Sequence, residues 1–333
     1  MMSKRITVIG DGGWGTALAL VLHGNGHDVT VWGPFEAIIE QISATRENTN
    51  YLPGIPLPEE ITWTADRRQA VRECEIAVLA IPTRYFRRVL ESFVGLFPAD
   101  CRFVSVAKGL DDDSHERMSV VAQTILKSDH VAALSGPSHA EEVARGIPTA
   151  VVMASEDHSL SKELQEVFAA SLFRVYSSDD VIGVELGGAL KNVIAIAVGM
   201  ADGLGFGDNT RAAVITRGLA EMTRLGMALG ARPETFAGLS GMGDLIVTCT
   251  SQHSRNRGVG ERIGRGEPIA TIMDGFKQAV EGVWNCAAAS ELAAALCVDV
   301  PVTHEVYAIV HQNQSPQDGV HALLKRDLKP ESM

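Results

Sequence analysis

The sequence predicts an α/β fold in which a doubly wound, mostly parallel sheet is followed by an all-helical C-terminal domain. Three observations lead to this prediction. A glycine-rich stretch at residues 10–15 joins a β-like run to a helix-like run, and short apolar runs then alternate with helix-like segments as far as about residue 180. Beyond that point the chain is rich in alanine and glycine, with few β-branched runs. We therefore expect two domains, residues 1–180 and residues 181–333.

The first β–α–β unit lies at the start of the chain. Arg5–Ile9 predicts a buried parallel strand, helix formers follow the glycines as far as His23, and Asp28–Trp32 predicts the second strand. Four later apolar runs predict further strands: Glu75–Pro82, Cys101–Gly109, His130–Ser138 and Pro148–Ser155. After Phe173–Asp180, the run Val181–Gly205 predicts a long apolar helix. Ligand-binding loops of such a sheet lie at the carboxyl ends of its strands, here Pro82-Thr83, Lys108-Gly109 and Gly136-Pro137-Ser138.

The glycines of the stretch Gly-Asp-Gly-Gly-Trp-Gly each have a physical role in a Rossmann-like unit. Gly10 makes the tight turn, Gly12 lets a pyrophosphate approach the backbone, and Gly15 lets the helix pack on the strand. The phosphates then meet unpaired N–H groups at the helix N-terminus. A glycine-rich turn alone is a weak signal, because such turns occur by chance. The order strand, turn, helix and strand favours a dinucleotide as the ligand.

The residues after the second strand do not decide between NAD and NADP. About twenty residues after the glycines, an acid is expected for the ribose 2′-hydroxyl of NAD, or an arginine for the 2′-phosphate of NADP. The sequence there is Trp-Gly-Pro-Phe, and Glu36 is the nearest acid. If Glu36 reaches the ribose, NAD is preferred; if it points to solvent, Arg46 or backbone donors could admit NADP. The lack of a local cation leans toward NAD or the use of both cofactors.

Composition limits the classes of partner. The chain has 333 residues, a hydrophobic fraction of 46% and a net charge of −12, so it can bury a large core but lacks the cationic surface that nucleic acid or an anionic membrane requires. An anionic small substrate requires cations concentrated in a cleft. We expect no membrane span, because the longest apolar run, Val193–Ala201, is short and is interrupted by Gly199. The oligomeric state stays open, a homodimer included.

Cysteine usage and the first strand bear on the cellular compartment. The five cysteines are odd in number and show no C-x-x-C spacing, which favours buried free thiols over disulfides or a metal site. The first predicted strand begins at residue 5 and leaves no room for a signal peptide. We therefore expect a cytoplasmic protein.

Lys191 is the first candidate for chemistry. It lies in the middle of the long predicted helix, with Gly187 and Gly188 one turn before it and Ala195 one turn after it, so this helix face lacks bulky side chains. One interpretation is close helix–helix packing, with Lys191 reaching out to water. The other is a ligand lying against the glycines, with the ammonium group beside it. Partial desolvation would then lower the lysine pKa toward the working pH, as proton transfer requires.

Two further stretches carry polar candidates. Ser254 can cap a helix whose first turn holds Arg255 and Asn256, where an arginine and free N–H groups suit a phosphate; an ordinary basic surface helix is the alternative. Asp244 follows two glycines and precedes an apolar run, so it is either a helix cap or a carboxylate aimed into a cleft. The histidines are scattered and no zinc or calcium motif appears, so we expect no metal site.

Seven motifs, in order along nearly the whole chain, resemble those of the bacterial NAD(P)-dependent glycerol-3-phosphate dehydrogenases. They are GDGGWG at residues 10–15, VAKGL around Lys108, GPSHAEE at Gly136, GGALKNVIAIAVG around Lys191, GMGDLIVTCTS around Asp244, SRNRG at Ser254 and VEG at Val280–Gly282. The resemblance implies reversible reduction of dihydroxyacetone phosphate by NADH or NADPH to sn-glycerol 3-phosphate, the backbone for phospholipid synthesis.

The resemblance also assigns roles to single residues. Lys191 matches the proton-transferring lysine of the family. Around the substrate it places Lys108, Gly136, Ser138, Asp244, Ser254, Arg255 and Asn256. Along the cofactor it places Gly13, Trp14, Tyr51, Tyr85, Lys108, Ala140, Arg255, Ala279 and Glu281, beside the three fingerprint glycines. One departure concerns Gly33-Pro34, where many bacterial members carry a basic residue, so the resemblance does not establish a preference for NADP.

Two other functions stay open at this level. A related dehydrogenase of β-hydroxyacids or sugar acids would share the architecture but take a carboxylate in place of a phosphate. A non-catalytic dinucleotide sensor would have no need for Lys191 beside glycines.

Overall fold

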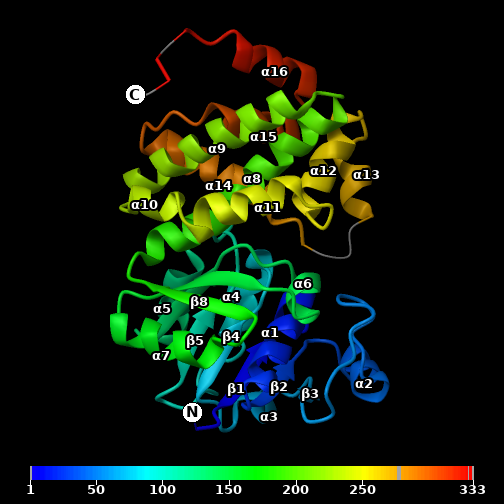
Figure 1. Ribbon diagram of the computed structural model, residues 1–333, viewed down its shortest axis with the longest axis vertical. Helices are drawn as coiled ribbons and strands as arrows, with labels where there is room; N and C mark the ends of the chain where they lie inside the picture. The colour runs from blue at the N-terminus through cyan, green and yellow to red at the C-terminus, as the bar shows by residue number, and fades with distance from the viewer. Residues whose placement is uncertain (1, 276–278, 329, 332–333) are drawn as a thin grey trace.

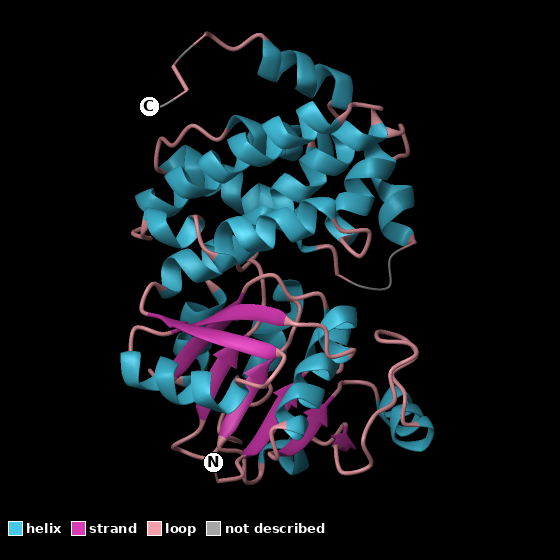
Figure 2. Cartoon of the chain, viewed as in Figure 1, coloured by secondary structure: helices cyan, strands magenta, loops and turns pink. Residues whose placement is uncertain are grey.

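The computed structural model describes residues 2–275, 279–328 and 330–331. A sheet flanked by helices forms one half of the molecule, and the other half is helical (Figure 2). The N-terminus lies at the outer end of the sheet half, and the C-terminal segment lies at the opposite end of the molecule (Figure 1). The predicted fold class is confirmed.

One sheet contains eight strands in the order β3-β2-β1-β4-β5-β6-β7-β8. The strands are β1 Arg5–Ile9, β2 Asp28–Trp32, β3 Thr62–Thr64, β4 Ile76–Leu79, β5 Arg102–Ser105, β6 Val131–Ser135, β7 Thr149–Ala154 and β8 Phe173–Ser178. All neighbouring strands are parallel except β6 and β7, which run antiparallel. The strand order reverses between β1 and β4, and in open α/β sheets ligands bind at such a point, outside the carboxyl ends of the strands.

Strand residues alternate between two apolar layers. Ile6 and Val8 of β1 join one core cluster, whereas Ile9 joins another on the opposite face of the sheet. The helices of this half are α1 Gly13–Gly24, α2 Glu36–Thr45, α3 Arg67–Val71, α4 Thr83–Glu91, α5 Met118–Leu126, α6 Ala140–Ala144 and α7 His158–Phe168. Residues of α1, α2, α6 and α7 belong to the first cluster, and residues of α3, α4 and α5 belong to the second. The sheet is therefore covered on both faces, as its apolar strands require.

The helical half is arranged around α8, Val181–Gly203, which is buried along most of its length. The other helices are α9 Asp208–Ala228, α10 Pro233–Phe236, a π-helical turn Leu239–Gly243, α11 Asp244–Thr250, α12 Arg255–Gly264, α13 Ile269–Asp274, α14 Glu281–Ala295, α15 Pro301–His311 and α16 Pro316–Leu324. Helix α12 crosses α8 closely, because a Cβ on Gly260 would overlap the carbonyl oxygen of Ile196 and one on Gly199 would overlap that of Arg257. This contact holds the start of α12 at Asn192, the residue after Lys191 on α8, to which Asn256 donates at 2.9 Å.

By length and composition alone, α8 is long and apolar enough to cross a membrane, which the short apolar runs of the sequence did not indicate. However, 89% of its most apolar window is buried inside the protein, so α8 is the core helix of this half. The five cysteines are all free, as expected, and four are buried. Cys297 departs from the expectation because it is exposed.

Candidate active site

The glycine-rich turn between β1 and α1 leaves an open backbone surface. Gly10 has φ +121°, a conformation that other residues rarely adopt, and a Cβ on Gly15 would overlap the carbonyl oxygen of Gly10. A Cβ on Gly12, in contrast, would meet no atom of the described residues within 4 Å. Gly12 is also the N-cap of α1 and makes no side-chain cap, so the first N–H groups of the helix are available to an anion. This turn fits the pyrophosphate of a dinucleotide.

Residues from three segments surround the turn. A Cβ on Gly13 would lie 2.7 Å from the carbonyl oxygen of Tyr51 and 3.7 Å from the Cβ of Ala140, the first residue of α6. Trp14 lies in the first turn of α1, and its ring packs at 6.5 Å from that of Phe173. The structure therefore places four of the expected cofactor residues around one backbone turn.

One expected cofactor residue of the helical half, Glu281, bonds to the sheet half at the start of α4. Glu281, at the start of α14, accepts hydrogen bonds from the backbone N (3.1 Å) and the hydroxyl group of Thr83, at the start of α4. Burial raises the pKa of Glu281. Tyr85 lies two residues further along α4 and is 44% exposed. Arg255 donates from Nη1 to the carbonyl oxygen of Ala279 at 2.7 Å.

A buried ionic cluster lies where the two halves meet. Asp244, which is 1% exposed, accepts hydrogen bonds from Lys191 Nζ at 2.7 Å and from Lys108 Nζ at 2.9 Å. Lys108 also donates to the carbonyl oxygen of Gly136 at 2.8 Å and to Ser138 Oγ at 3.3 Å. Two cations thus share one carboxylate, which leaves an excess of positive charge beside the carboxyl ends of β5 and β6. An anionic substrate needs such an excess in a protein of net charge −12.

Lys191 is the most buried cation of this cluster. Burial lowers the pKa of its ammonium group to about 8, the charge of Asp244 opposes that shift and the charge of Lys108 adds to it. Lys191 also donates to Thr248 Oγ1 at 2.6 Å. The fold therefore holds a lysine whose proton can be given or taken close to neutral pH, as general acid–base chemistry requires.

Both interpretations of the glycines before Lys191 need correction. A Cβ on Gly187 would lie 2.5 Å from the carbonyl oxygen of Ser240, and one on Gly188 would lie 2.6 Å from Ser135 Oγ. The glycines therefore admit protein atoms of the π-helical turn and of β6, which confirms the close packing of the first interpretation and leaves no space there for the ligand of the second. The expectation that Lys191 reaches out to water is wrong, because the residue is 6% exposed and its ammonium group bonds to Asp244 and Thr248.

Asp244 and Ser254 differ in whether their side chains cap a helix. The carboxylate of Asp244 bonds to the two lysines, and the N-cap of α11 is Gly243 without a side-chain cap, so the helix-cap interpretation of Asp244 is wrong. Ser254 caps α12 as expected, accepting from Arg257 N at 3.3 Å. Asn256 is buried; it donates to Asn192 Oδ1 and accepts from Gly282 N, each at 2.9 Å.

Sequence reasoning missed several residues of this site. Asn192 and Asn285 both donate to the carbonyl oxygen of Lys108, at 3.1 and 3.3 Å, and so fix the loop that carries this lysine. Thr248 stands one helical turn after Asp244, a spacing that could have indicated it. His139 is half-buried, and its Nε2 has no hydrogen-bond partner in the described chain. Burial, then the charges of Lys191 and Lys108, lower the pKa of His139.

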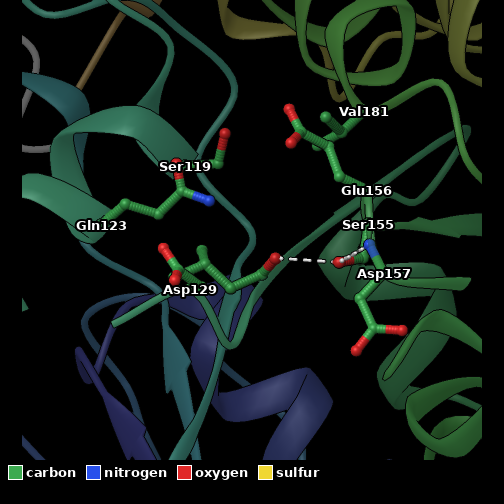
Figure 3. Close-up of a pocket in the computed structure, with 8 residues that line it drawn as sticks. Ser119, Gln123, Asp129, Ser155, Glu156, Asp157 and Val181 are labelled. Atoms are coloured by element: carbon green, nitrogen blue, oxygen red, sulfur yellow. Dashed lines mark hydrogen bonds between the residues drawn. The ribbon is translucent and has the colours of Figure 1, made fainter. Parts of the chain in front are cut away.

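A hollow of about 290 Å³ lies beside the start of α8 (Figure 3). Three acidic side chains line it: Asp129, Glu156 and Asp157. Ser155 also lines it, and its Oγ donates to the carbonyl oxygen of Val131 at 3.1 Å. Three carboxylates would repel a phosphate, so the lysine cluster is the better site for an anionic substrate. Within the described residues, no group of three or more histidines, cysteines or acids is placed to hold a metal ion.

Comparisons with known proteins identify close relatives of the whole chain. The family models described as the N-terminus and the C-terminus of NAD-dependent glycerol-3-phosphate dehydrogenase match residues 5–161 and 180–321. The glycerol-3-phosphate dehydrogenase [NAD(P)+] of Citrifermentans bemidjiense is 46% identical over the full length of both chains. That of Clostridium acetobutylicum is 45% identical, over 98% of each chain. The crystal structure of glycerol-3-phosphate dehydrogenase from Coxiella burnetii superimposes with a TM-score of 0.93 at 39% identity, covering 97% of this chain and 99% of its own.

Proposed function

This chain belongs to the NAD-dependent glycerol-3-phosphate dehydrogenase family, and on that premise we propose which of its residues bind, orient and protonate the substrate. It is an NAD(P)-dependent oxidoreductase that interconverts dihydroxyacetone phosphate and sn-glycerol 3-phosphate. The bound nicotinamide supplies or accepts the hydride. The residues of this chain supply everything else that the reaction needs: binding, orientation, charge stabilisation and a proton.

Lys191 is the proton donor in the direction of reduction. As hydride reaches the carbonyl carbon, negative charge develops on the substrate oxygen, and a protonated ammonium group beside it stabilises that charge and then gives up its proton. The sharing of Asp244 between Lys191 and Lys108 is the observation that carries this assignment. Asp244 keeps Lys191 protonated despite its burial, and Lys108 orients the substrate.

The phosphate of the substrate binds at the start of α12. Two features support this assignment: the helix begins with the arginine that suits a phosphate, and its first turn bonds through Asn256 to Asn192, the residue after Lys191. The phosphate is remote from the reacting carbonyl, so its binding energy serves to position the substrate. The residues proposed to surround the substrate are Lys108, Gly136, Ser138, Asp244, Ser254, Arg255 and Asn256.

The cofactor lies along the carboxyl ends of β1, β2 and β4, with its pyrophosphate at the start of α1. The residues proposed to line it are Gly10, Gly12, Gly13, Trp14, Gly15, Tyr51, Tyr85, Lys108, Ala140, Arg255, Ala279 and Glu281. The division into residues 1–180 and 181–333 follows from the same arrangement, since the last strand ends at Ser178 and the first helix of the other half begins at Val181.

The cellular role rests on the product and on the composition. The product, sn-glycerol 3-phosphate, provides the backbone for phospholipid synthesis. Free cysteines suit the reducing cytoplasm, and the acidic net charge favours a small-molecule partner over nucleic acid or an anionic membrane.

A spectrophotometric assay tests the function directly. Oxidation of NADH or NADPH, followed by absorbance, should depend on dihydroxyacetone phosphate and proceed much more slowly with unphosphorylated dihydroxyacetone. Equal rates with a β-keto acid would favour the hydroxyacid dehydrogenase alternative. Cofactor binding without turnover of any of these substrates would favour a dinucleotide sensor.

A further inference from the structure

Asp11, between the first two glycines of the turn, carries a carboxyl group that the fold buries without satisfying. The residue is 7% exposed, and its Oδ2 has no hydrogen-bond partner within the described chain. Burial raises the pKa of this carboxyl group. A buried polar atom without a partner costs stability, and the great majority of such atoms are paired. The carboxyl group of Asp11 therefore indicates a partner from outside the chain.

Gly33 shows which space this carboxyl group occupies. Gly33 directly follows β2, the strand at whose end NAD-binding units of this class carry their ribose-binding acid. A Cβ built on Gly33 would lie 2.7 Å from Cγ and 2.8 Å from Oδ2 of Asp11. The carboxyl group of Asp11 thus takes the space that a side chain at position 33 would need. The acid missing from the end of β2 is present at the same place, from the turn after β1.

A hydrogen bond from the buried side chain of Asn48 holds the backbone of Asp11 in position. Asn48, which is fully buried, donates from Nδ2 to the carbonyl oxygen of Asp11 at 2.7 Å and to Thr16 Oγ1 at 2.9 Å. Tyr51 is close enough for the charge of Asp11 to contribute, after burial, to a raised pKa of its phenol. The carboxyl group is therefore part of a fixed arrangement beside the glycine turn, not a mobile surface group.

The other charged candidates near the end of β2 are engaged elsewhere or exposed. Arg46 donates from Nη1 to the carbonyl oxygens of Ile61, at 3.2 Å, and Pro58, at 3.5 Å, so its guanidinium group binds the loop that precedes β3. Glu36 is exposed and lines an open hollow of about 570 Å³ between α2 and β3. The charge that lies against Gly33 is that of Asp11.

We propose that Asp11 accepts the hydrogen bond of the adenosine ribose 2′-hydroxyl, in place of an acid at the end of β2, and makes the enzyme prefer NADH to NADPH. This inference rests on the proposed dinucleotide site. A carboxylate is an acceptor that suits a hydroxyl group, whereas the 2′-phosphate of NADPH would bring two like charges together in a partly desolvated place. We expect native binding to favour the ligand without the 2′-phosphate by roughly tenfold or more.

The experiment compares ADP-ribose with 2′-phospho-ADP-ribose by titration calorimetry, and NADH with NADPH by kcat/KM. Asp11→Asn removes the charge and keeps the shape of the side chain, whereas Asp11→Ala removes both. Glu36→Gln is the matched control, because it neutralises an acid near the same strand end that does not lie against Gly33. Thermal melting shows that each variant is folded, and loss of an unsatisfied carboxyl group should not lower the melting temperature.

We expect both Asp11 variants to reduce the preference for the ligand without the 2′-phosphate by roughly tenfold, in binding and in kcat/KM, and Glu36→Gln to change it less than about threefold. An unchanged preference in folded Asp11 variants, or an equal change in Glu36→Gln, would overturn the inference. If the native protein reduces dihydroxyacetone phosphate but binds the two ligands equally, the inference alone fails. If it binds neither ligand, the dinucleotide site fails with it.

Discussion

The glycine turn after β1 and the lysine cluster at the start of α11 are built in opposite ways. The turn consists of residues 10–15, and it presents backbone N–H groups and the space left by absent side chains. The cluster consists of side chains, and its hydrogen bonds join Asp244 to a lysine 53 residues earlier and to one 136 residues earlier. The turn is formed by residues of one β–α unit, whereas the cluster joins residues from both halves of the molecule.

This difference separates two kinds of binding. A backbone site recognises the part that all dinucleotides share, the pyrophosphate, and tolerates little change in the residues that shape it. A side-chain site selects by charge and by the pKa of each group, so single substitutions alter its chemistry without removing its framework. Substitutions in the cluster should therefore lower turnover more than cofactor affinity, and substitutions in the turn should lower cofactor affinity more than turnover.

Replacement of Lys191 is the largest expected effect and tests this separation most directly. Lys191→Ala removes the proposed proton donor, so turnover of dihydroxyacetone phosphate should fall by roughly 10²-fold or more while the dissociation constant of NADH changes little. The measurements are steady-state kcat and fluorescence titration with NADH. Lys162→Ala, which removes an exposed lysine on α7, is the control for loss of a positive charge. Near-normal turnover in folded Lys191→Ala would assign the lysine to packing alone.

The pH dependence of the reaction tests the electrostatics of the cluster. The pKa of Lys191 is lowered to about 8, and the proposed mechanism uses the protonated form for reduction. The kcat/KM for reduction should therefore be level below about pH 8 and fall above it, whereas that for oxidation of glycerol 3-phosphate, which requires the neutral amine, should rise through the same pH. The shared midpoint of the two profiles is the internal control.

Asp244→Asn shows how much of that pKa depends on the shared carboxylate. Without its charge, burial and the neighbouring Lys108 act on Lys191 unopposed, so the midpoint should move to lower pH by roughly one unit or more. At pH 7.5 the rate of reduction should fall as a consequence, with NADH affinity retained. A midpoint that does not move would show that Asp244 does not keep Lys191 protonated.

Two glycines of the turn provide a matched pair for the backbone site. Gly12→Ala places a methyl group where no protein atom lies within 4 Å, so the protein should remain as stable while NADH binds roughly tenfold more weakly. Gly15→Ala forces a methyl group onto the carbonyl oxygen of Gly10, so its melting temperature should fall. Thermal melting and NADH titration together distinguish the two results. Equal losses of stability would mean that Gly12 serves the fold and not the ligand.

The same division explains what the sequence could predict. The fold class and the strands around the glycine turn were predictable, because apolar periodicity and turn residues are local signals. The short edge strand Thr62–Thr64 was missed, since three residues carry little pattern. For Lys191, local pattern left packing and catalysis open, and only the resemblance to a family favoured catalysis. The unpaired carboxyl group of Asp11 had no sequence signal, because its meaning depends on the absence of a side chain at Gly33, just after the neighbouring strand.

Arg255 lies where the two regions meet, and its replacement has the smallest expected effect. Its Nη1 bonds to the carbonyl oxygen of Ala279, two residues before the Glu281 that joins α14 to α4 on the cofactor side. Among the described residues the other nitrogens of its planar group have no hydrogen-bond partner, and we propose that they bind a phosphate at the start of α12. Arg255→Lys retains the charge but cannot make both contacts at once, so the KM for dihydroxyacetone phosphate should rise by up to about tenfold while kcat stays within about twofold.

The constant that changes in Arg255→Lys shows whether Arg255 belongs to the substrate site or to the cofactor site. If it binds the substrate phosphate, the KM for dihydroxyacetone phosphate rises and the rate with unphosphorylated dihydroxyacetone does not change. If Arg255 binds the cofactor, the dissociation constant of NADH rises instead, and the rates with dihydroxyacetone phosphate and with unphosphorylated dihydroxyacetone fall by the same factor. Arg262→Lys is the matched control, because Arg262 lies on the same helix and pairs with Glu267. A rise in both constants would make Arg255 the residue through which the side-chain site and the backbone site are coupled, since one guanidinium group would then hold the two ligands in register.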